Sequence, residues 1–252
     1  MQTPTPHARR RPFASIALGA CIAAALPAAY AATTGSGQAS SESRSVGRFQ
    51  AITLRGAIDL VVRQGASESV TVRGDDNLLP SVQTVVEGTG DARSLHIQIK
   101  PGESLRTKTP IVVTVDVVRL DALASAGTGN ITLKALRMPA LSLSISGSSN
   151  AKLQQLDTDR LRIDIAGSGD VQASGRATRL DIAIAGSGDV RTRDLNAAEV
   201  SVAIAGSGDA SVTAQKSLSV SIAGSGDVDY AGGASQVSKS IVGSGTLRAR
   251  QP

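Results

Sequence analysis

The second half of the chain alternates apolar residues with small or polar ones, in short segments that each end at a glycine-rich turn. A period of two residues predicts β-strands with one buried face. A shorter strand-like piece follows each turn, as in 170–173. Each repeat should therefore supply a long strand, a tight corner, a short strand and a looser return. The alternating segments are Leu141–Ile145, Leu161–Ile165, Leu180–Ile184, Val200–Ile204 and Leu218–Ile222.

The turns recur at nearly constant spacing. The same pattern runs from Gly127-Thr128-Gly129-Asn130 to Gly243-Ser244-Gly245-Thr246, and successive first glycines lie 20, 20, 19, 20, 18 and 19 residues apart. Such a repeat is too short for a strand-helix-strand unit, and hairpins would not place the same turn in every repeat. The sequence therefore predicts an all-β protein, a single-stranded parallel β-helix with one coil of about 18–20 residues per repeat and strands ~4.8 Å apart.

The last residue of each turn is the main candidate for chemistry. Stacked coils should bring Asp170, Asp189, Asp209 and Asp227 into one column, where carboxylates repel one another unless something compensates them. Backbone N–H groups of the adjacent corner could do so, and so could a calcium ion, as in Gly-Gly-x-Gly-x-Asp repeats. Turn capping is the favoured interpretation, because asparagine takes the same position at 130 and 150. Calcium is the alternative cofactor, with these four aspartates as its ligands.

The composition argues against an enzyme. His96 is the one histidine after the first 31 residues, and no cysteine follows Cys21, so a Cys-His or Ser-His-Asp constellation lacks its parts. We expect His96 on the polar side of a strand. Regularly repeated acids suit a structural position better than an active site, and only Phe49 and Tyr230 remain to stack on sugars. No catalytic residue is assigned, and a polysaccharide-cleaving β-helix enzyme is a lesser alternative.

Residues 1–31 have the pattern of an export signal. Arg9, Arg10 and Arg11 precede an apolar stretch from Phe13 to Leu26, and an Ala-Tyr-Ala cleavage pattern ends at residue 31. Residues 18–21 resemble a lipobox that would lipidate Cys21, but the apolar residues after it favour an ordinary signal peptide. The arginines also resemble a twin-arginine signal, so the export route stays open. The stretch is too short to span a membrane, and we expect an exported protein with no transmembrane span, periplasmic or at the cell surface.

The charge changes when the signal is removed. Residues 1–31 hold three arginines and no acid, so the formal net charge falls from +5 to +2. The remaining Lys and Arg are scattered along the sequence and aromatic residues are few, which argues against a nucleic-acid partner. Residues 32–45, rich in Ser, Gly and Thr, are expected to form a flexible linker.

Residues 46–126 contain the same ingredients with less order. The segment Phe49–Val62 resembles a degenerate strand-turn-strand unit, and Val70–Leu79 adds a Gly-Asp-Asp-Asn-Leu-Leu motif. We expect these irregular strands to cap the solenoid, with regular coils at 127–247 and a tail at 248–252. If an end is left open, end-to-end self-association becomes a second interaction, although Arg248 and Arg250 could blunt the C-terminal edge.

These two segments, together with the repeated Ile-Ala-Gly-Ser-Gly-Asp, resemble the putative auto-transporter adhesin, head GIN domain family of bacterial envelope proteins. The resemblance covers about residues 46–245. It implies a right-handed β-helix on an exported protein, with an adhesin label and no established activity or catalytic residues. On this basis we expect a non-enzymatic binding or scaffolding module of the cell envelope, whose partner is an unidentified envelope or extracellular protein or glycan.

Overall fold

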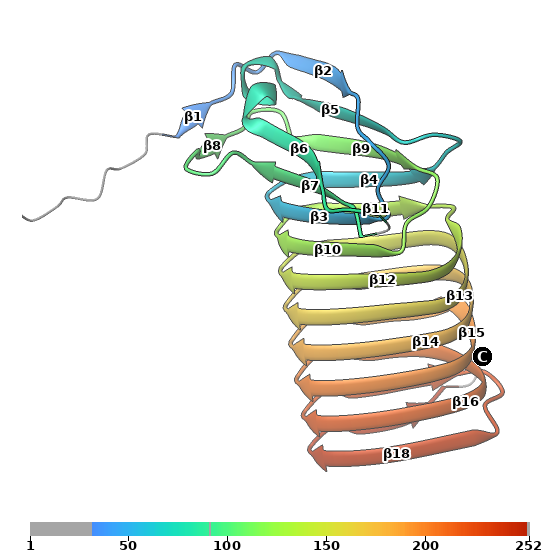
Figure 1. Ribbon diagram of the computed structural model, residues 1–252. Helices are drawn as coiled ribbons and strands as arrows, with labels where there is room; N and C mark the ends of the chain where they lie inside the picture. Colours follow the sequence, from blue (N-terminus) through green and yellow to red (C-terminus); the bar gives the residue numbers. More distant parts are fainter. Residues whose placement is uncertain (1–31, 91, 251–252) are drawn as a thin grey trace, which may run out of the picture. The chain divides into compact units, whose positions relative to one another are not determined.

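The computed structural model describes residues 32–90 and 92–250, which form a right-handed solenoid of parallel β-coils with about six turns (Figure 1). In Figure 1 the strands in front point to the left and those behind point to the right, and each successive coil lies below the one before it. The predicted all-β solenoid is confirmed. Its regular coils consist of β10 (Ala122–Gly127), β11 (Asn130–Lys134), β12 (Arg137–Gly147), β13 (Asn150–Gly167), β14 (Val171–Gly186), β15 (Val190–Gly206), β16 (Ala210–Gly224), β17 (Asp227–Ala231), β18 (Gln236–Gly243) and β19 (Thr246–Ala249).

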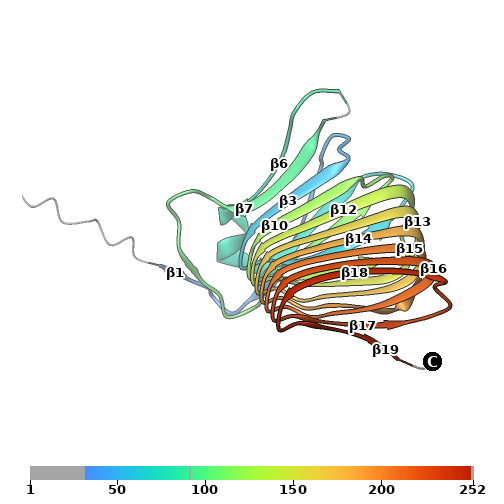
Figure 2. The same ribbon diagram turned by 90° about the horizontal axis from the view of Figure 1, so that it is seen from below.

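Equivalent residues of successive coils stack in columns. Leu161 pairs in register with Leu180, Leu180 with Val200, and Val200 with Leu218. The inward columns are aliphatic and buried, because alternate side chains of a strand point to the same face. Each fully buried Leu, Ile or Val contributes ~1.5–3 kcal/mol relative to exposure. Figure 2, viewed along the coil axis, shows the two sheets that enclose this core.

The glycine corners are required by the close approach of successive coils. At Gly188 an added Cβ atom would lie 2.2 Å from the carbonyl oxygen of Gly169 and 3.0 Å from Cγ2 of Ile165. Gly186, at the start of the same corner, has φ +138°, a region that side chains disfavour. Close contact with the preceding coil therefore demands glycine at position 188, and the backbone conformation demands it at position 186.

Ser149 is the informative exception at the second corner glycine. In later coils that position packs against an isoleucine of the preceding coil, but the corresponding residue beside Ser149 is Ser125. Both side chains are buried and their hydroxyl oxygens lie 2.9 Å apart in a hydrogen bond. A second serine thus provides both the space and the polar partner that the first needs.

The return from the short strand to the long one is more ordered than we expected. Strands β13 to β16 each run through short strand, bend and long strand without interruption. The glycine corners stay in register from coil to coil, whereas the register shifts of these pairs lie at the bends, between Leu153 and Leu156, for example. Differences in repeat length are therefore absorbed at the bend opposite the corner.

The N-terminal part closes the solenoid with a different chain path. It contains β1 (Thr33–Thr34), β2 (Ala39–Arg44), β3 (Ala51–Gly56), β4 (Asp59–Gln64), β5 (Ser69–Asp75), a 3-10 helix η1 (Asp76–Ser81), β6 (Val82–Glu87), β7 (Ser94–Ile99), β8 (Leu105–Arg106) and β9 (Val112–Val117). The coil of β3 and β4 lies between β7 and β9 on one side and β10 and β11 on the other. The chain thus passes from β2 into the stack at β3 and β4, returns to the cap through β5 to β9, and re-enters the stack at β10.

Antiparallel strands cover the N-terminal edge of each sheet. Strand β6 pairs with β7 on one sheet, and β5 and β2 extend the other beyond β9. Leu78 and Leu79 of η1 are buried. The irregular segment therefore caps the core, as atypical terminal units must.

The predicted flexible linker at 32–45 is wrong. Residues of this segment form β1, which pairs with β8, and β2, which pairs with β5. The composition suggested a linker because small polar residues also suit an exposed edge strand, which is stabilised by backbone hydrogen bonds.

Asp75, in the Gly-Asp-Asp-Asn motif, holds the first strands in place. Its buried carboxylate accepts backbone N–H groups from Gly37 at 3.0 Å, Lys108 at 2.8 Å and Thr109 at 3.1 Å. Burial raises the pKa of Asp75, but these hydrogen bonds, with one from the Thr109 side chain, lower it below its ordinary value. The motif therefore ties the 33–38 segment and the 105–109 loop to the cap.

The expected export signal, with Cys21, lies outside the described residues. Among residues 32–90 and 92–250, no helix is long and apolar enough to cross a membrane.

Candidate functional site

The acidic column forms the ladder of caps that the turn sequence predicts. The backbone N–H of Asp189 donates to Oδ1 of Asp170 at 3.1 Å, that of Asp209 to Asp189 at 3.1 Å, and that of Asp227 to Asp209 at 2.7 Å. Oδ1 of Asn150 accepts the Asp170 N–H in the same way, at 3.2 Å. One oxygen of each aspartate therefore caps the next coil, and an amide does the same work.

The second carboxylate oxygens of three ladder aspartates, Asp170, Asp189 and Asp227, face arginines. Arg191 contacts Oδ2 of Asp170 at 3.2 Å and Oδ2 of Asp189 at 2.8 Å, and Arg248 contacts Oδ2 of Asp227 at 3.3 Å. Hydrogen bonding from the Thr246 side chain, opposed by burial, lowers the pKa of Asp227. These cations offset the repulsion within the column.

Calcium binding by Asp170, Asp189, Asp209 and Asp227 stays a prediction. In the described part of the chain, no group of three or more His, Cys, Asp or Glu side chains is arranged to hold a metal ion. The ladder aspartates stand one per coil and each already accepts a backbone hydrogen bond, Asp227 from the N–H of Thr246. His96 lies on β7 with Nε2 3.8 Å from a Glu87 carboxylate, on the polar side of the strand as expected.

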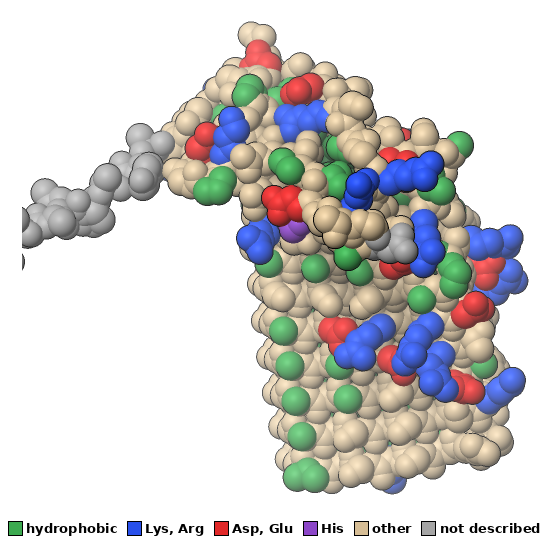
Figure 3. Space-filling model, in the orientation of Figure 1, with side chains coloured by type: hydrophobic (Ala, Val, Ile, Leu, Met, Phe, Trp, Pro, Cys, Tyr) green, Lys and Arg blue, Asp and Glu red, His purple; other side chains and the backbone are tan. Residues whose placement is uncertain are grey.

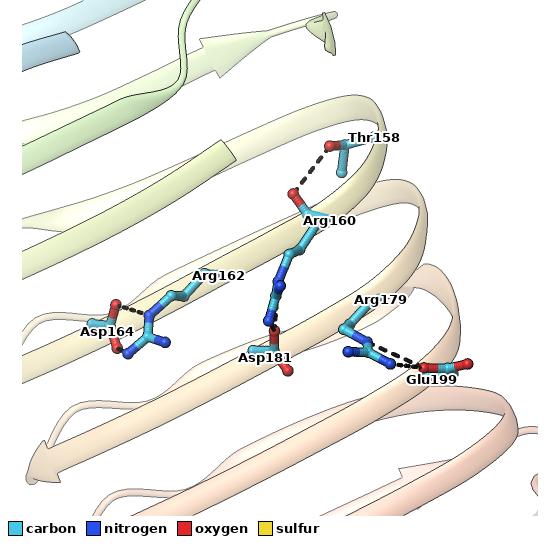
Figure 4. A network of polar contacts seen from close by, with 7 residues as sticks. All are labelled: Thr158, Arg160, Arg162, Asp164, Arg179, Asp181 and Glu199. Carbon is cyan, nitrogen blue, oxygen red and sulfur yellow. Dashed lines mark hydrogen bonds and ion pairs between the residues drawn. The ribbon is translucent and has the colours of Figure 1, made fainter. Parts of the chain in front are cut away.

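The long-strand sheet, which faces the viewer in Figure 3, carries two different surfaces. One is a patch of ion pairs on the middle coils, drawn in Figure 4, in which Arg160 holds Asp181, Arg162 holds Asp164 and Arg179 holds Glu199. Nearby, the hydrogen bond from Arg176, against some desolvation, lowers the pKa of Asp157 to about 2, and Arg137 adds to the effect. Mutual pairing leaves this patch with little free charge.

The second surface on that sheet is a shallow apolar depression of about 530 Å³. It is formed mainly by outward alanines and serines near the glycine corner. The apolar side chains of this sheet are visible as regular green columns on the lower coils in Figure 3. The depression is shallow because the outward side chains that alternate with the buried isoleucines are small.

A larger depression than this one lies on the opposite sheet, where the short strands bend into the return. We call it the bend groove; its volume is about 830 Å³. It crosses five successive coils, from β11 to β16, which corresponds to about 19 Å along the solenoid axis at ~4.8 Å per coil. Its lining residues are Lys134, Ala135, Lys152, Leu153, Gln154, Gln155, Gln172, Ala173, Ser174, Arg191, Arg193, Asp194 and Ser211.

The bend groove lies where the repeat is least regular. Ala135 and Gln155 are the two non-glycine residues of the described chain with positive φ, +52° and +53°, and both line it. The register shifts of β13 to β16 fall at the same bends. Strained backbone and broken repeats are features that functional sites commonly carry.

The bend groove is basic. Four cations line it, and because Arg191 and Arg193 are paired with aspartates beside the groove, its unpaired positive charge is that of Lys134 and Lys152, against the carboxylate of Asp194. Arg191 is oriented by the ladder aspartates, and Arg193 lies 3.3 Å from Oδ2 of Asp229. Lys134 and Lys152 are exposed and have no ion-pair partner among the described residues. The groove thus presents two unpaired ammonium groups beside two oriented guanidinium groups.

This cluster is not apparent from the sequence, because its cations are scattered along the chain. A signal was present: they stand two or four residues after the Asx that ends a turn, as in Asn150 to Lys152, Asn130 to Lys134, and Asp189 to Arg191. Once the coils are stacked, Lys152, Gln172, Arg191 and Ser211 form one outward column. Scattered basic residues therefore converge.

Comparison with known proteins identifies the relatives of this solenoid. The family model for the putative auto-transporter adhesin, head GIN domain, matches residues 48–234. The chain belongs to this family. The resemblance noted from the Gly-Ser-Gly-Asp repeats is therefore confirmed.

Solved structures share the fold. A putative adhesin from Bacteroides fragilis is 22% identical, with a TM-score of 0.80 over 86% of this chain and 100% of its own. A putative adhesin from Parabacteroides distasonis is 28% identical, with a TM-score of 0.68 over 87% and 100%. A protein of the same organism described as a putative lipid binding protein is 24% identical, with a TM-score of 0.71 over 87% and 100%. No curated protein matches the chain.

Proposed function

We propose that this protein is an exported, non-enzymatic binding module of the cell envelope, and that the bend groove is its binding surface. The observation that carries the proposal is the groove itself, which collects side chains from five coils at the place where the repeat breaks. Membership of a family of putative adhesins supports a binding role.

A rigid scaffold suits this role. Every strand of the middle coils is hydrogen-bonded on both sides, so the groove is held open before any ligand arrives. A preformed site loses little conformational freedom on binding. The length of the groove favours an extended ligand over a small compact one.

The proposal is tested by filling the groove without changing its charge. In Gln172→Trp an indole would occupy the middle of the groove, because Gln172 is exposed there. Ser201→Trp is the matched control, since Ser201 is exposed on the long-strand sheet. Binding of the purified proteins to envelope fractions is measured by co-sedimentation.

The expected result is retention of binding by the wild type and Ser201→Trp and its loss in Gln172→Trp, with the three proteins melting at similar temperatures. Equal binding by all three proteins would place the contact surface elsewhere and overturn the assignment of the groove. Loss of binding in Ser201→Trp alone would move the site to the long-strand sheet.

A further inference from the structure

We infer that the ligand of the bend groove is an acidic polysaccharide, an extended sugar polymer that carries carboxylate or phosphate groups at regular intervals. This inference rests on the proposed function of the groove and adds the chemical class of its ligand. It follows from the charge, the hydrogen-bonding groups and the backbone pairing of the groove.

The charge selects an anion. Lys134 and Lys152 lack ion-pair partners in the described chain, and their ammonium groups are free to contact a ligand. Arg191, two coils beyond Lys152, lies about 10 Å further along the axis at ~4.8 Å per coil. A polymer whose negative groups recur at such intervals can reach both positions at once, which raises its avidity over that of a single anion.

The neutral lining selects sugar. Gln154, Gln155 and Gln172 provide amide groups, and Ser174 and Ser211 provide hydroxyl groups, between the cations. Each amide both donates and accepts hydrogen bonds, which matches the hydroxyl groups of a sugar chain. No residue of the groove lining is aromatic, so the stacking platform that single-stranded nucleic acids use is missing from it.

The backbone disfavours a peptide. An extended peptide binds most readily by adding a strand to a free sheet edge. Strands β13, β14 and β15, which form the centre of the groove, are paired on both sides by the strands before and after them. The ligand must therefore be recognised through side chains.

The test compares polygalacturonate with its fully methyl-esterified form, which keeps the sugar chain and removes its charge. The expected result is that the purified protein binds the acidic polymer and not the ester. Lys134→Gln/Lys152→Gln should weaken binding by about tenfold, since each exposed ion pair contributes modestly to affinity, and Lys134→Arg/Lys152→Arg should restore it. Lys100→Gln/Lys216→Gln, which removes the same charge from exposed or half-exposed sites outside the groove lining, is the control.

Further arms separate the alternatives. A polyol phosphate polymer that binds more tightly than polygalacturonate, with the same dependence on Lys134 and Lys152, would identify phosphate as the charged group within the proposed class. Tighter binding of single-stranded DNA, equal binding of the ester, or an equal loss in the Lys100/Lys216 control would overturn the inference. If Gln172→Trp abolishes binding to envelope fractions while no acidic polymer binds, the groove stands and only its ligand class is wrong. Shortening of polygalacturonate during incubation would contradict the non-enzymatic role.

Discussion

The stacking of the glycine corners leads to a quantitative prediction for Gly188→Ala. The new Cβ atom would lie 2.2 Å from the carbonyl oxygen of Gly169, where carbon contacts are favourable only at ~3.5–4.0 Å. Relief therefore needs a separation of the two coils by about 1 Å or more at this corner. The opposing atom belongs to the backbone and cannot rotate away.

The cost follows from what that separation would disturb. Overpacking typically costs ~1–3 kcal/mol. The separation would also stretch the hydrogen bond from Ser187 N–H to Gly167 O, 2.9 Å, and the cap from Asp189 N–H to Asp170, 3.1 Å, each worth ~0.5–1.5 kcal/mol. Alanine also reduces the conformational entropy of the unfolded chain, which offsets the loss of stability by ~0.4–1 kcal/mol. We expect Gly188→Ala to lower the free energy of unfolding by about 3 kcal/mol.

Urea unfolding followed by far-UV circular dichroism measures this loss. Gly47→Ala is the control, because its Cβ atom meets nothing within 4 Å and Gly47 has no positive φ. It should change stability by less than about 1 kcal/mol. Equal stability of the two variants would refute the close approach of successive corners and, with it, the coil stacking.

The remaining predictions concern the acidic column, acid stability and the open end. Asp189→Ala should lower the free energy of unfolding in urea by ~0.5–1.5 kcal/mol, and Asp189→Asn should lower it less, because an amide still accepts the backbone N–H of Asp209. Calcium should leave the melting temperature of the wild type unchanged. A calcium-dependent rise in melting temperature that is lost in Asp189→Asn/Asp209→Asn would instead reveal a calcium site. Because the pKa of Asp157 is lowered in the folded protein, its ion pairs stabilise the fold at pH values above its ordinary pKa of about 3.8 and are lost as the pH falls from about 4 to about 2. The melting temperatures of the wild type and Asp157→Asn should therefore converge over that range. A difference that stays constant with pH would contradict the role of these ion pairs. Lys239 pairs in register with the buried Val220 and so points inward on the last coil, where a charged side chain discourages pairing with the edge of another molecule. In sedimentation velocity, Lys239→Leu should form dimers at concentrations where the wild type is monomeric. A monomeric variant would show that the lysine does not prevent edge pairing.

The repeat made the regular coils predictable. Alternation fixed which residues of the segments around Leu161 and Leu180 point inward, and the constant turn fixed which residues stack, because a one-residue slip would expose the core. The caps of the acidic column followed from the same reasoning, since Asx side chains commonly accept backbone N–H groups at turns.

The chain path of the N-terminal part was not predictable in this way. Strands β3 and β4 pair with β7 and β9 as well as β10 and β11, and nothing in their local sequence records that a later segment lies above them. The edge strand β2 was missed because its stability comes from backbone pairing with β5, which polar composition does not report. The bend groove was missed because its cations converge only after stacking.

A crystal structure of the protein with a bound acidic oligosaccharide would test the role of the bend groove most directly. We predict a ligand lying along the bend groove, with its anionic groups near Lys134, Lys152 and Arg191 and its hydroxyl groups bonded to the glutamines between them. A ligand bound instead over the alanine and serine columns of the long-strand sheet would contradict it.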